Sequence, residues 1–266
     1  MDIRSVFEKI ANEYPEAKKQ TLKNHPLAKF IRSEVPKSFK DDLGYIISKY
    51  KVLVAKHAGN WSRVAWIVLL DPRVSETATR GYYPVYSFFE NGKKIMLSLG
   101  QGYRDIKSEY KNEADDILIS RGIILKNKAG DFKKFGFKNV HGTKITIKSD
   151  KEREVWVKSC AFGKIYDVKN LPSNNELIND AKNILNIYEN IIQRGGTSEL
   201  IENIDPEEIE IIKDLSGSEK KALKKHREHE KYYIKTDPKF IKSLKKKFNY
   251  TCQACNLKFE KIYGKY

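Results

Sequence analysis

Residues 59–102 read GNWSRVAWIVLLDPRVSETATRGYYPVYSFFENGKKIMLSLGQG, and this stretch decides the fold. It contains three apolar runs, at 64–70, 82–89 and 94–99, which are rich in β-branched and aromatic residues and are separated by turn-forming residues. That pattern predicts adjacent strands. The aromatic side chains exceed what the inner face of three short strands needs, so we expect some of them to line a pocket. They are Trp61, Trp66, Tyr82, Tyr83, Tyr86, Phe88 and Phe89.

The segments before and after this stretch carry mostly helical patterns. Residues 4–19 place apolar side chains at helical spacing and predict a helix that ends near Pro15 or soon after. Residues 25–36 are interpreted as a loop with a short helical turn. Residues 103–122 predict a helix that stops at Gly122.

A later helix is the most secure of the chain. Ser173 and Glu176 have the spacing of a capping box, and an apolar stripe follows as far as the Gly195-Gly196 pair. Residues 45–54 resume a strand-prone pattern before the aromatic stretch. The sequence therefore predicts an α+β fold, with a twisted mixed or antiparallel sheet flanked by helices.

The composition favours a polyanionic partner. The 266 residues include 51 Lys and Arg against 35 Asp and Glu, a formal net charge of +16. Lysine and arginine placed against phosphates release counterions and strengthen binding to nucleic acid, although a lysine-rich surface that only interacts with water would have the same composition. No apolar run approaches the roughly 20 residues that span a bilayer, and the N-terminus lacks a secretory core. We therefore expect a cytoplasmic protein without a membrane partner.

A basic tract with interleaved phenylalanines follows the predicted helix at 103–122. Its lysines could bind backbone phosphates while its rings stack on bases. Alternatively, its rings could cover the core below an exposed loop. The sequence favours neither interpretation over the other. The DNA-binding candidates of this tract are Lys133, Lys134 and Lys138, next to Phe132, Phe135 and Phe137.

A set of motifs in a fixed order is more specific than any one of them. They are Gly59-Asn60-Trp61, Trp66-Ile67-Val68, Asp71-Pro72, the run GYYPVY at 81–86, the run LSLGQG at 97–102, and Leu171-Pro172 before a helix that reaches Tyr188. In this combination the first 193 residues resemble the N-terminal DNA-binding domain of McrB, the specificity subunit of a modification-dependent restriction system. The resemblance implies a mixed α+β domain that flips 5-methylcytosine, or a related modified base, into an aromatic pocket.

The resemblance also implies roles for individual residues. Trp66 and Tyr83 would be pocket walls, although either ring could instead belong to the core. The loop 57–61 would approach the flipped nucleotide. The residues that would contact DNA or the base are therefore His57, Asn60, Trp61, Trp66, Tyr83 and Ser87, together with the three lysines of the basic tract. Because the chain departs from the family pattern at His57-Ala58 and at Ala65, the resemblance does not predict which modification is read.

The C-terminal part has a different character. We interpret 1–194 as the McrB-like domain, 195–218 as a linker, and 219–266 as a second unit. In that unit Cys252 and Cys255 have the two-residue gap of a zinc half site or a redox pair, and the basic helix-like run before them favours zinc.

The same unit resembles the entry to an HNH endonuclease domain. The resemblance rests on Arg227-Glu228, the cysteine pair with an aromatic residue after it, and Tyr263-Gly264. The family's catalytic histidines and second cysteine pair would follow Tyr266, so no residue here is assigned a catalytic role. A divalent metal for cleavage is expected only in a longer chain with the complete HNH domain.

The leading hypothesis is a sensor of double-stranded DNA with modified cytosine, acting with a nuclease partner or with a continuation of the chain. One alternative is a basic nucleic-acid-binding module without modification specificity. A third hypothesis is a redox protein that acts through the cysteine pair, which a zinc analysis with a thiol titration would separate from the other two.

Overall fold

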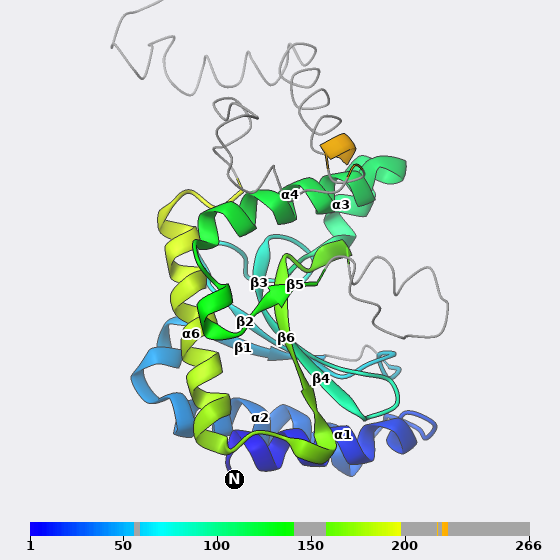
Figure 1. Ribbon diagram of the computed structural model, residues 1–266. Coiled ribbons are helices and arrows are strands. Elements are labelled where there is room, and N and C mark those ends of the chain that lie inside the picture. The colour runs from blue at the N-terminus through cyan, green and yellow to red at the C-terminus, as the bar shows by residue number, and fades with distance from the viewer. Residues whose placement is uncertain (56–58, 141–157, 198–216, 218–219, 223–266) are drawn as a thin grey trace, which may run out of the picture.

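An antiparallel sheet forms the centre of the protein (Figure 1). The computed structural model describes residues 1–55, 59–140, 158–197, 217 and 220–222. Within them the sheet has the strand order β1-β2-β3-β4-β6-β5, and every pairing is antiparallel. The strands are β1 (Lys51–Val54), β2 (Trp66–Leu70), β3 (Tyr82–Phe88), β4 (Lys94–Gln101), β5 (Lys138–Asn139) and β6 (Phe162–Asp167).

Three helices cover one face of the sheet: α1 (Ile3–Ala17), α2 (Pro26–Leu43) and α6 (Asn174–Gln193). Tyr86 of β3 packs against Phe7 of α1 and Phe39 of α2, with ring centroids 4.8 and 5.6 Å apart. Tyr82, four residues earlier on the same strand face, packs edge-on against Tyr188 of α6 at 5.7 Å. This helix layer and the sheet face beneath it form the main core.

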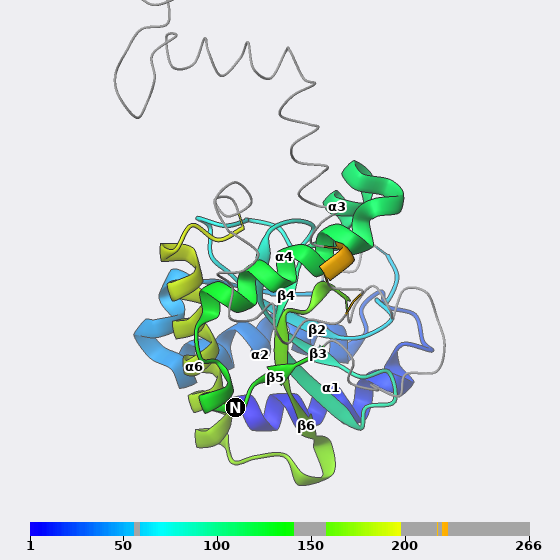
Figure 2. The ribbon, with the colours of Figure 1, turned by 45° about the horizontal axis from the view of Figure 1, so that its top comes forward.

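A helical hairpin lies at one end of the sheet (Figures 1 and 2). It consists of α3 (Tyr103–Tyr110) and α4 (Ala114–Ala129), joined by the short 3-10 turn η2 (Lys111–Glu113). The other 3-10 turns are η1 (Gly44–Lys49) before β1, η3 (Lys133–Phe135) before β5, and η4 (Val168–Asn170) before α6. No helix among the described residues is long and apolar enough to cross a bilayer.

The predicted α+β class with an antiparallel sheet is confirmed for the described residues. The three apolar runs of 59–102 form the neighbouring strands β2, β3 and β4. The capping box at Ser173 and Glu176 is present, with both reciprocal hydrogen bonds. The predicted linker 195–218 and the unit 219–266 lie almost entirely outside the described residues, so those domain boundaries stay predictions.

Two predictions about helices were wrong. The segment at 25–36 belongs to the 18-residue helix α2, because Pro26 occupies the first helical position, where its missing N–H costs nothing. The helix expected to stop at Gly122 continues to Ala129, and the real break lies at Lys111, which has a positive φ of 47°. Gly122 is buried inside α4, so packing outweighs its weak helix propensity.

Candidate nucleic-acid interface

Three of the predicted base-contacting residues share the sheet face opposite the helix layer. Trp66 on β2 pairs directly with Ser87 on β3. Tyr83 lies four residues before Ser87 on the same strand, so its side chain points to the same face, about 13 Å along the strand. The fold therefore brings Trp66 and Ser87 together and places Tyr83 at the other end of this face.

Tyr83 is buried in this structure. Its side chain is 6% exposed, and its hydroxyl donates a hydrogen bond of 2.6 Å to the carbonyl oxygen of Ala78. Burial raises the pKa of Tyr83 well above its ordinary value, which keeps the hydroxyl protonated at neutral pH. The ring has the surroundings of a core residue, the alternative that the sequence left open.

The middle of the same face is also covered. Met96 of β4 packs with Val140, Cys160 and the partly buried Phe89, and Ser87 is only 1% exposed. Burial raises the pKa of Cys160 to about 11, although hydrogen bonds from serines oppose the rise. Cys160 is therefore a neutral, buried thiol.

Trp66 keeps part of its surface open at the start of β2. The N–H of Ala55 donates to the carbonyl oxygen of Trp66 at 3.3 Å, so β1 leaves the sheet directly beside this tryptophan. The chain returns at Gly59 and Asn60, both exposed. His57, between Ala55 and Gly59, lies outside the described residues, and its predicted role stays a prediction.

Trp61 anchors the returning end of this loop on the helix layer. Its indole N–H donates to the carbonyl oxygen of Gln20 at 3.0 Å. Its ring packs edge-on against Tyr14 of α1 and His25 at the start of α2, with centroids 5.2 and 5.1 Å apart. Trp61 therefore has the contacts of a residue that positions the loop 57–61.

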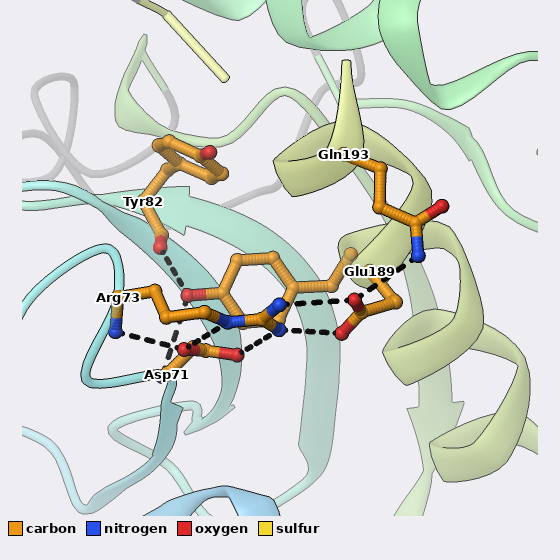
Figure 3. A network of polar contacts seen from close by, with 6 residues as sticks. Asp71, Arg73, Tyr82, Glu189 and Gln193 are labelled. Atoms are coloured by element: carbon orange, nitrogen blue, oxygen red, sulfur yellow. Dashed lines mark hydrogen bonds and ion pairs between the residues drawn. The ribbon is translucent and has the colours of Figure 1, made fainter. Parts of the chain in front are cut away.

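A polar network holds the segment after β2 (Figure 3). Ala78, whose carbonyl oxygen accepts the hydrogen bond from Tyr83, belongs to this segment. The guanidinium of Arg73 donates to Asp71 at 2.7 and 3.0 Å and to Glu189 of α6 at 2.6 and 3.1 Å. Tyr188 donates to the carbonyl oxygen of Tyr82 at 3.0 Å and accepts from the N–H of Asp71. The motif Asp71-Pro72 thus attaches this segment to α6, a role that the sequence alone did not reveal.

One guanidinium, that of Arg73, stabilises the two carboxylates of this network. Burial of Asp71 raises its pKa, but hydrogen bonds from Arg73 outweigh this effect, and the net result is a lowered pKa for Asp71. Hydrogen bonds from Arg73 also lower the pKa of Glu189. Both carboxylates are therefore ionised at neutral pH.

A basic edge, which we define as Lys133, Lys134 and Lys138, lies at η3 and β5, beside the last strand of the sheet. All three side chains are exposed, and none has an ion-pair partner within the described part of the chain. Lys134 lies over the ring of Phe135 at 4.9 Å. These three positive charges are available to an anionic ligand.

The phenylalanines of this tract belong to the core and not to the surface. Phe132 stacks on Phe162 of β6 with centroids 4.5 Å apart, and Phe137 meets the same ring edge-on at 5.9 Å. Both are buried. Of the two roles that the sequence allowed for these two rings, the structure supports the covering of the core.

Register places Lys138 on the same face as the predicted pocket residues. Lys138 pairs with Gly163, Gly163 with Ser98, and Ser98 with Val85, which lies between Tyr83 and Ser87. At about 4.8 Å per strand, Lys138 is roughly 14 Å from Val85 across the sheet. One face of the sheet therefore carries Trp66 and Tyr83 and, at its edge, Lys138.

The described residues contain no group of three or more His, Cys, Asp or Glu side chains that could hold a metal ion. Cys252 and Cys255 lie outside them, so the zinc half site is untested.

Comparison with known proteins identifies a family for most of the chain. A family model described as "MrcB-like, N-terminal domain" matches residues 9–193. The match ends at the last residue of α6 and does not extend to the C-terminal unit. A search of curated proteins found no match.

Proposed function

The chain belongs to the MrcB-like N-terminal domain family, and we propose on this basis that it binds double-stranded DNA with a modified cytosine in a restriction system. The family match supports the restriction-system role. The sheet face that carries the partly exposed Trp66 and, at its edge, Lys138 supports a nucleic-acid ligand, since cations bind phosphates and aromatic rings stack on bases. That shared face is the observation on which the proposal depends.

The proposed reading step is capture of an extruded base beside Trp66. Extrusion costs a few kcal/mol in lost stacking and pairing. Stacking on an aromatic ring returns about 1–3 kcal/mol per base. Trp66 suits this step better than Tyr83, because Trp66 is partly exposed at the exit of β1 whereas the Tyr83 hydroxyl is bonded to Ala78.

The proposed lip of the pocket is the loop 57–61. Asn60 is exposed and can offer its amide to a base edge, and Trp61 fixes the loop to the helix layer through Gln20, Tyr14 and His25. A methyl group contributes only about 0.8 kcal/mol of apolar burial, so discrimination requires a close fit. An anchored loop suits that requirement.

The test compares full-length protein on methylated and unmodified duplexes of one sequence at one salt concentration. We expect the methylated duplex to bind more tightly. Trp66→Ala should remove the preference and retain the salt-dependent background binding, because the phosphate contacts remain.

Tyr45→Ala is the matched control, since Tyr45 is a ring 81% exposed on η1, beside the helix layer. It should keep the preference. Equal affinity of the unchanged protein for both duplexes would reject modification sensing.

A basic DNA-binding module without modification specificity is the second candidate. The burial of Tyr83 and Ser87 favours it, because most of this face is closed and only the basic edge and part of Trp66 are left for contact. In that case DNA affinity would depend on the salt concentration and on the length of the duplex but not on methylation of its cytosines.

The C-terminal cysteine pair is a separate proposal. Cys252 and Cys255 would supply two of the four ligands of a structural zinc ion, and nuclease activity would need the rest of an HNH domain. Metal analysis of the purified protein with a thiol titration tests this: a disulfide without zinc would indicate a redox pair.

A further inference from the structure

His25 is a half-buried histidine whose two ring nitrogens have different partners. It directly precedes the first turn of α2, and its Nδ1 accepts a hydrogen bond from the backbone N–H of Leu27 at 3.2 Å. A backbone N–H can only donate, so Nδ1 carries no proton and the ring is neutral. The ring proton therefore lies on Nε2, which donates to the side-chain oxygen of Gln20 at 3.3 Å.

The same two residues hold the indole of Trp61. The carbonyl oxygen of Gln20 accepts from the indole N–H at 3.0 Å, and the ring of His25 lies edge-on to the indole, with centroids 5.1 Å apart. Gly59 and Asn60, directly before this tryptophan, are exposed. The connection between α1 and α2, which contains Gln20 and His25, therefore fixes the end of the loop proposed to meet the base.

The other titratable groups near the indole keep to their own contacts. Tyr14 packs on the indole, and burial raises the pKa of Tyr14 to about 12. Lys18 and Arg63 share the carboxylate of Glu90, at 2.8 and 3.6 Å. Within the described part of the chain, no acidic or basic side chain forms a hydrogen bond or ion pair with His25. Imidazole is the side chain that changes charge between pH 5 and 8, so His25 is the pH-sensitive contact of this indole.

We propose that neutral His25 is a positioning residue for base recognition, and that its protonation weakens the distinction between methylated and unmodified DNA. A proton on Nδ1 removes the acceptor that caps α2, and a positive charge is unfavourable at a helix N-terminus. The ring is then no longer held at Nδ1, and Trp61 loses a fixed neighbour. This inference rests on the proposed function, because a close fit to the base requires a fixed loop.

The binding test measures the affinities of the full-length protein for methylated and unmodified duplexes of one sequence, at one salt concentration, at pH 8 and at pH 5.5. We expect the ratio of the two affinities to fall about fivefold at pH 5.5, the factor that corresponds to a lost N-cap. The ratio cancels the general gain in phosphate binding that protonated histidines bring to both duplexes. A preference at pH 8 that persists in full at pH 5.5 would overturn the proposal.

His25→Asn is the matched variant, because asparagine caps helices well and its acceptor does not titrate. Its affinity ratio should be the same at both pH values. His25→Ala has no acceptor and should show the lowered ratio at both. A pH dependence that persists in His25→Asn would belong to another histidine, such as His57 of the loop, and would overturn the role of His25.

Nuclear magnetic resonance reports the contact without DNA. The indole N–H signal of Trp61, assigned with Trp61→Phe, should shift between pH 8 and pH 5.5 with the same midpoint as the ring protons of His25. It should not shift in His25→Asn, and the dispersion of the same spectra shows whether each variant is folded. A Trp61 signal that ignores His25, or that shifts equally in His25→Asn, would contradict the proposed contact.

The two measurements separate this inference from the proposed function. Equal affinity for both duplexes at pH 8 would reject modification sensing and with it this role of His25, even if the Trp61 signal follows pH. A preference at pH 8 without any response to pH would reject the role of His25 alone.

Discussion

The hydroxyl of Tyr86 is completely buried and has no hydrogen-bond partner among the described residues. Nearby, Tyr166 of β6 donates to the buried carboxylate of Asp180 on α6 at 2.9 Å, and Lys164 pairs with the same carboxylate. Two tyrosines in one core thus differ in whether their polar atom is satisfied. This difference decides how each responds to loss of its hydroxyl.

Tyr86→Phe should leave the free energy of unfolding unchanged or raise it by about 1 kcal/mol, because it removes an unsatisfied polar atom and keeps the ring. Tyr166→Phe should lower it by about 1–3 kcal/mol, because Asp180 loses a donor. Urea unfolding of both variants measures this. A clear loss of stability in Tyr86→Phe would mean that its hydroxyl has a partner.

The Arg73 network makes stability depend on pH. Because Arg73 lowers the pKa values of Asp71 and Glu189, its stabilisation is complete above their ordinary values of 3.8 and 4.5 and is lost as pH falls through the lower values of the folded state. Arg73→Gln should cost about 2 kcal/mol at neutral pH, since buried Asp71 loses its charged donor.

The difference between Arg73→Gln and the unchanged protein should shrink at pH 3, measured by denaturant unfolding at both pH values. Arg80→Gln is the control, because Arg80 is an exposed arginine of the same segment. A constant difference across this pH range would contradict the proposed linkage.

At the scale of elements, the helices and strands that could be predicted from the sequence are those with a local apolar periodicity or a capping motif. The strands β2 to β4, helix α1 and the capping box of α6 have such signals and are confirmed. Helix α2 was missed because two prolines suggested a loop, yet apolar residues at helical spacing direct this segment into the core.

The candidate site was predictable only in part, for a similar reason. The pairing of Trp66 with Ser87 follows from two strands that could be located from the sequence. The bond from Tyr83 to Ala78 could not be predicted, because residues 71–81 have no periodicity and are held by contacts with Glu189, more than a hundred residues away. Burial of a ring is decided by such distant segments.

Gly102 marks the junction of β4 and α3, where two backbones approach closely. A Cβ atom at this position would lie 2.2 Å from the backbone nitrogen of Arg80, and the N–H of Gly102 donates to Gly81 at 2.9 Å. Gly102→Ala should therefore cost about 2–3 kcal/mol, measured by thermal or urea unfolding.

Gly217→Ala is the control for this substitution, since a Cβ atom there would meet nothing within 4 Å. It should change stability by less than about 0.5 kcal/mol. Equal effects of the two substitutions would show that the close approach at Gly102 is not required.

At the scale of the whole molecule, a net charge of +16 becomes informative through its placement. The composition alone allowed either a nucleic-acid ligand or a lysine-rich surface. The register of β5 gives the location of one of these charges, because it puts Lys138 on the same sheet face as Trp66 and Tyr83. That placement required the pairing of β4 with β6, which no local signal predicts.

Replacement of Lys133, Lys134 and Lys138 by glutamine should reduce the salt dependence of DNA binding. The logarithm of the association constant falls with the logarithm of the salt concentration, and each lost phosphate contact makes this slope less steep by about 0.9. The slope of the triple variant should therefore be less steep by about 2–3. The measurement is a titration of duplex DNA at several salt concentrations.

The control removes the same charge from α2, with Lys29, Lys37 and Lys40 replaced by glutamine. These lysines are exposed on the helix layer. If both triple variants lose the same slope, the basic edge has no special part in binding.

The pairing of β4 with β6 also has a consequence for synthesis of the chain. Residues 102–161 separate these neighbouring strands. At roughly 5–20 residues per second, a ribosome needs on the order of 3–12 seconds to make them. During that time the hairpins β1–β4 can form, while β4 exposes an unpaired edge. A nascent chain should therefore be most vulnerable to aggregation just before β6 emerges, which chains stalled before and after residue 167 would reveal.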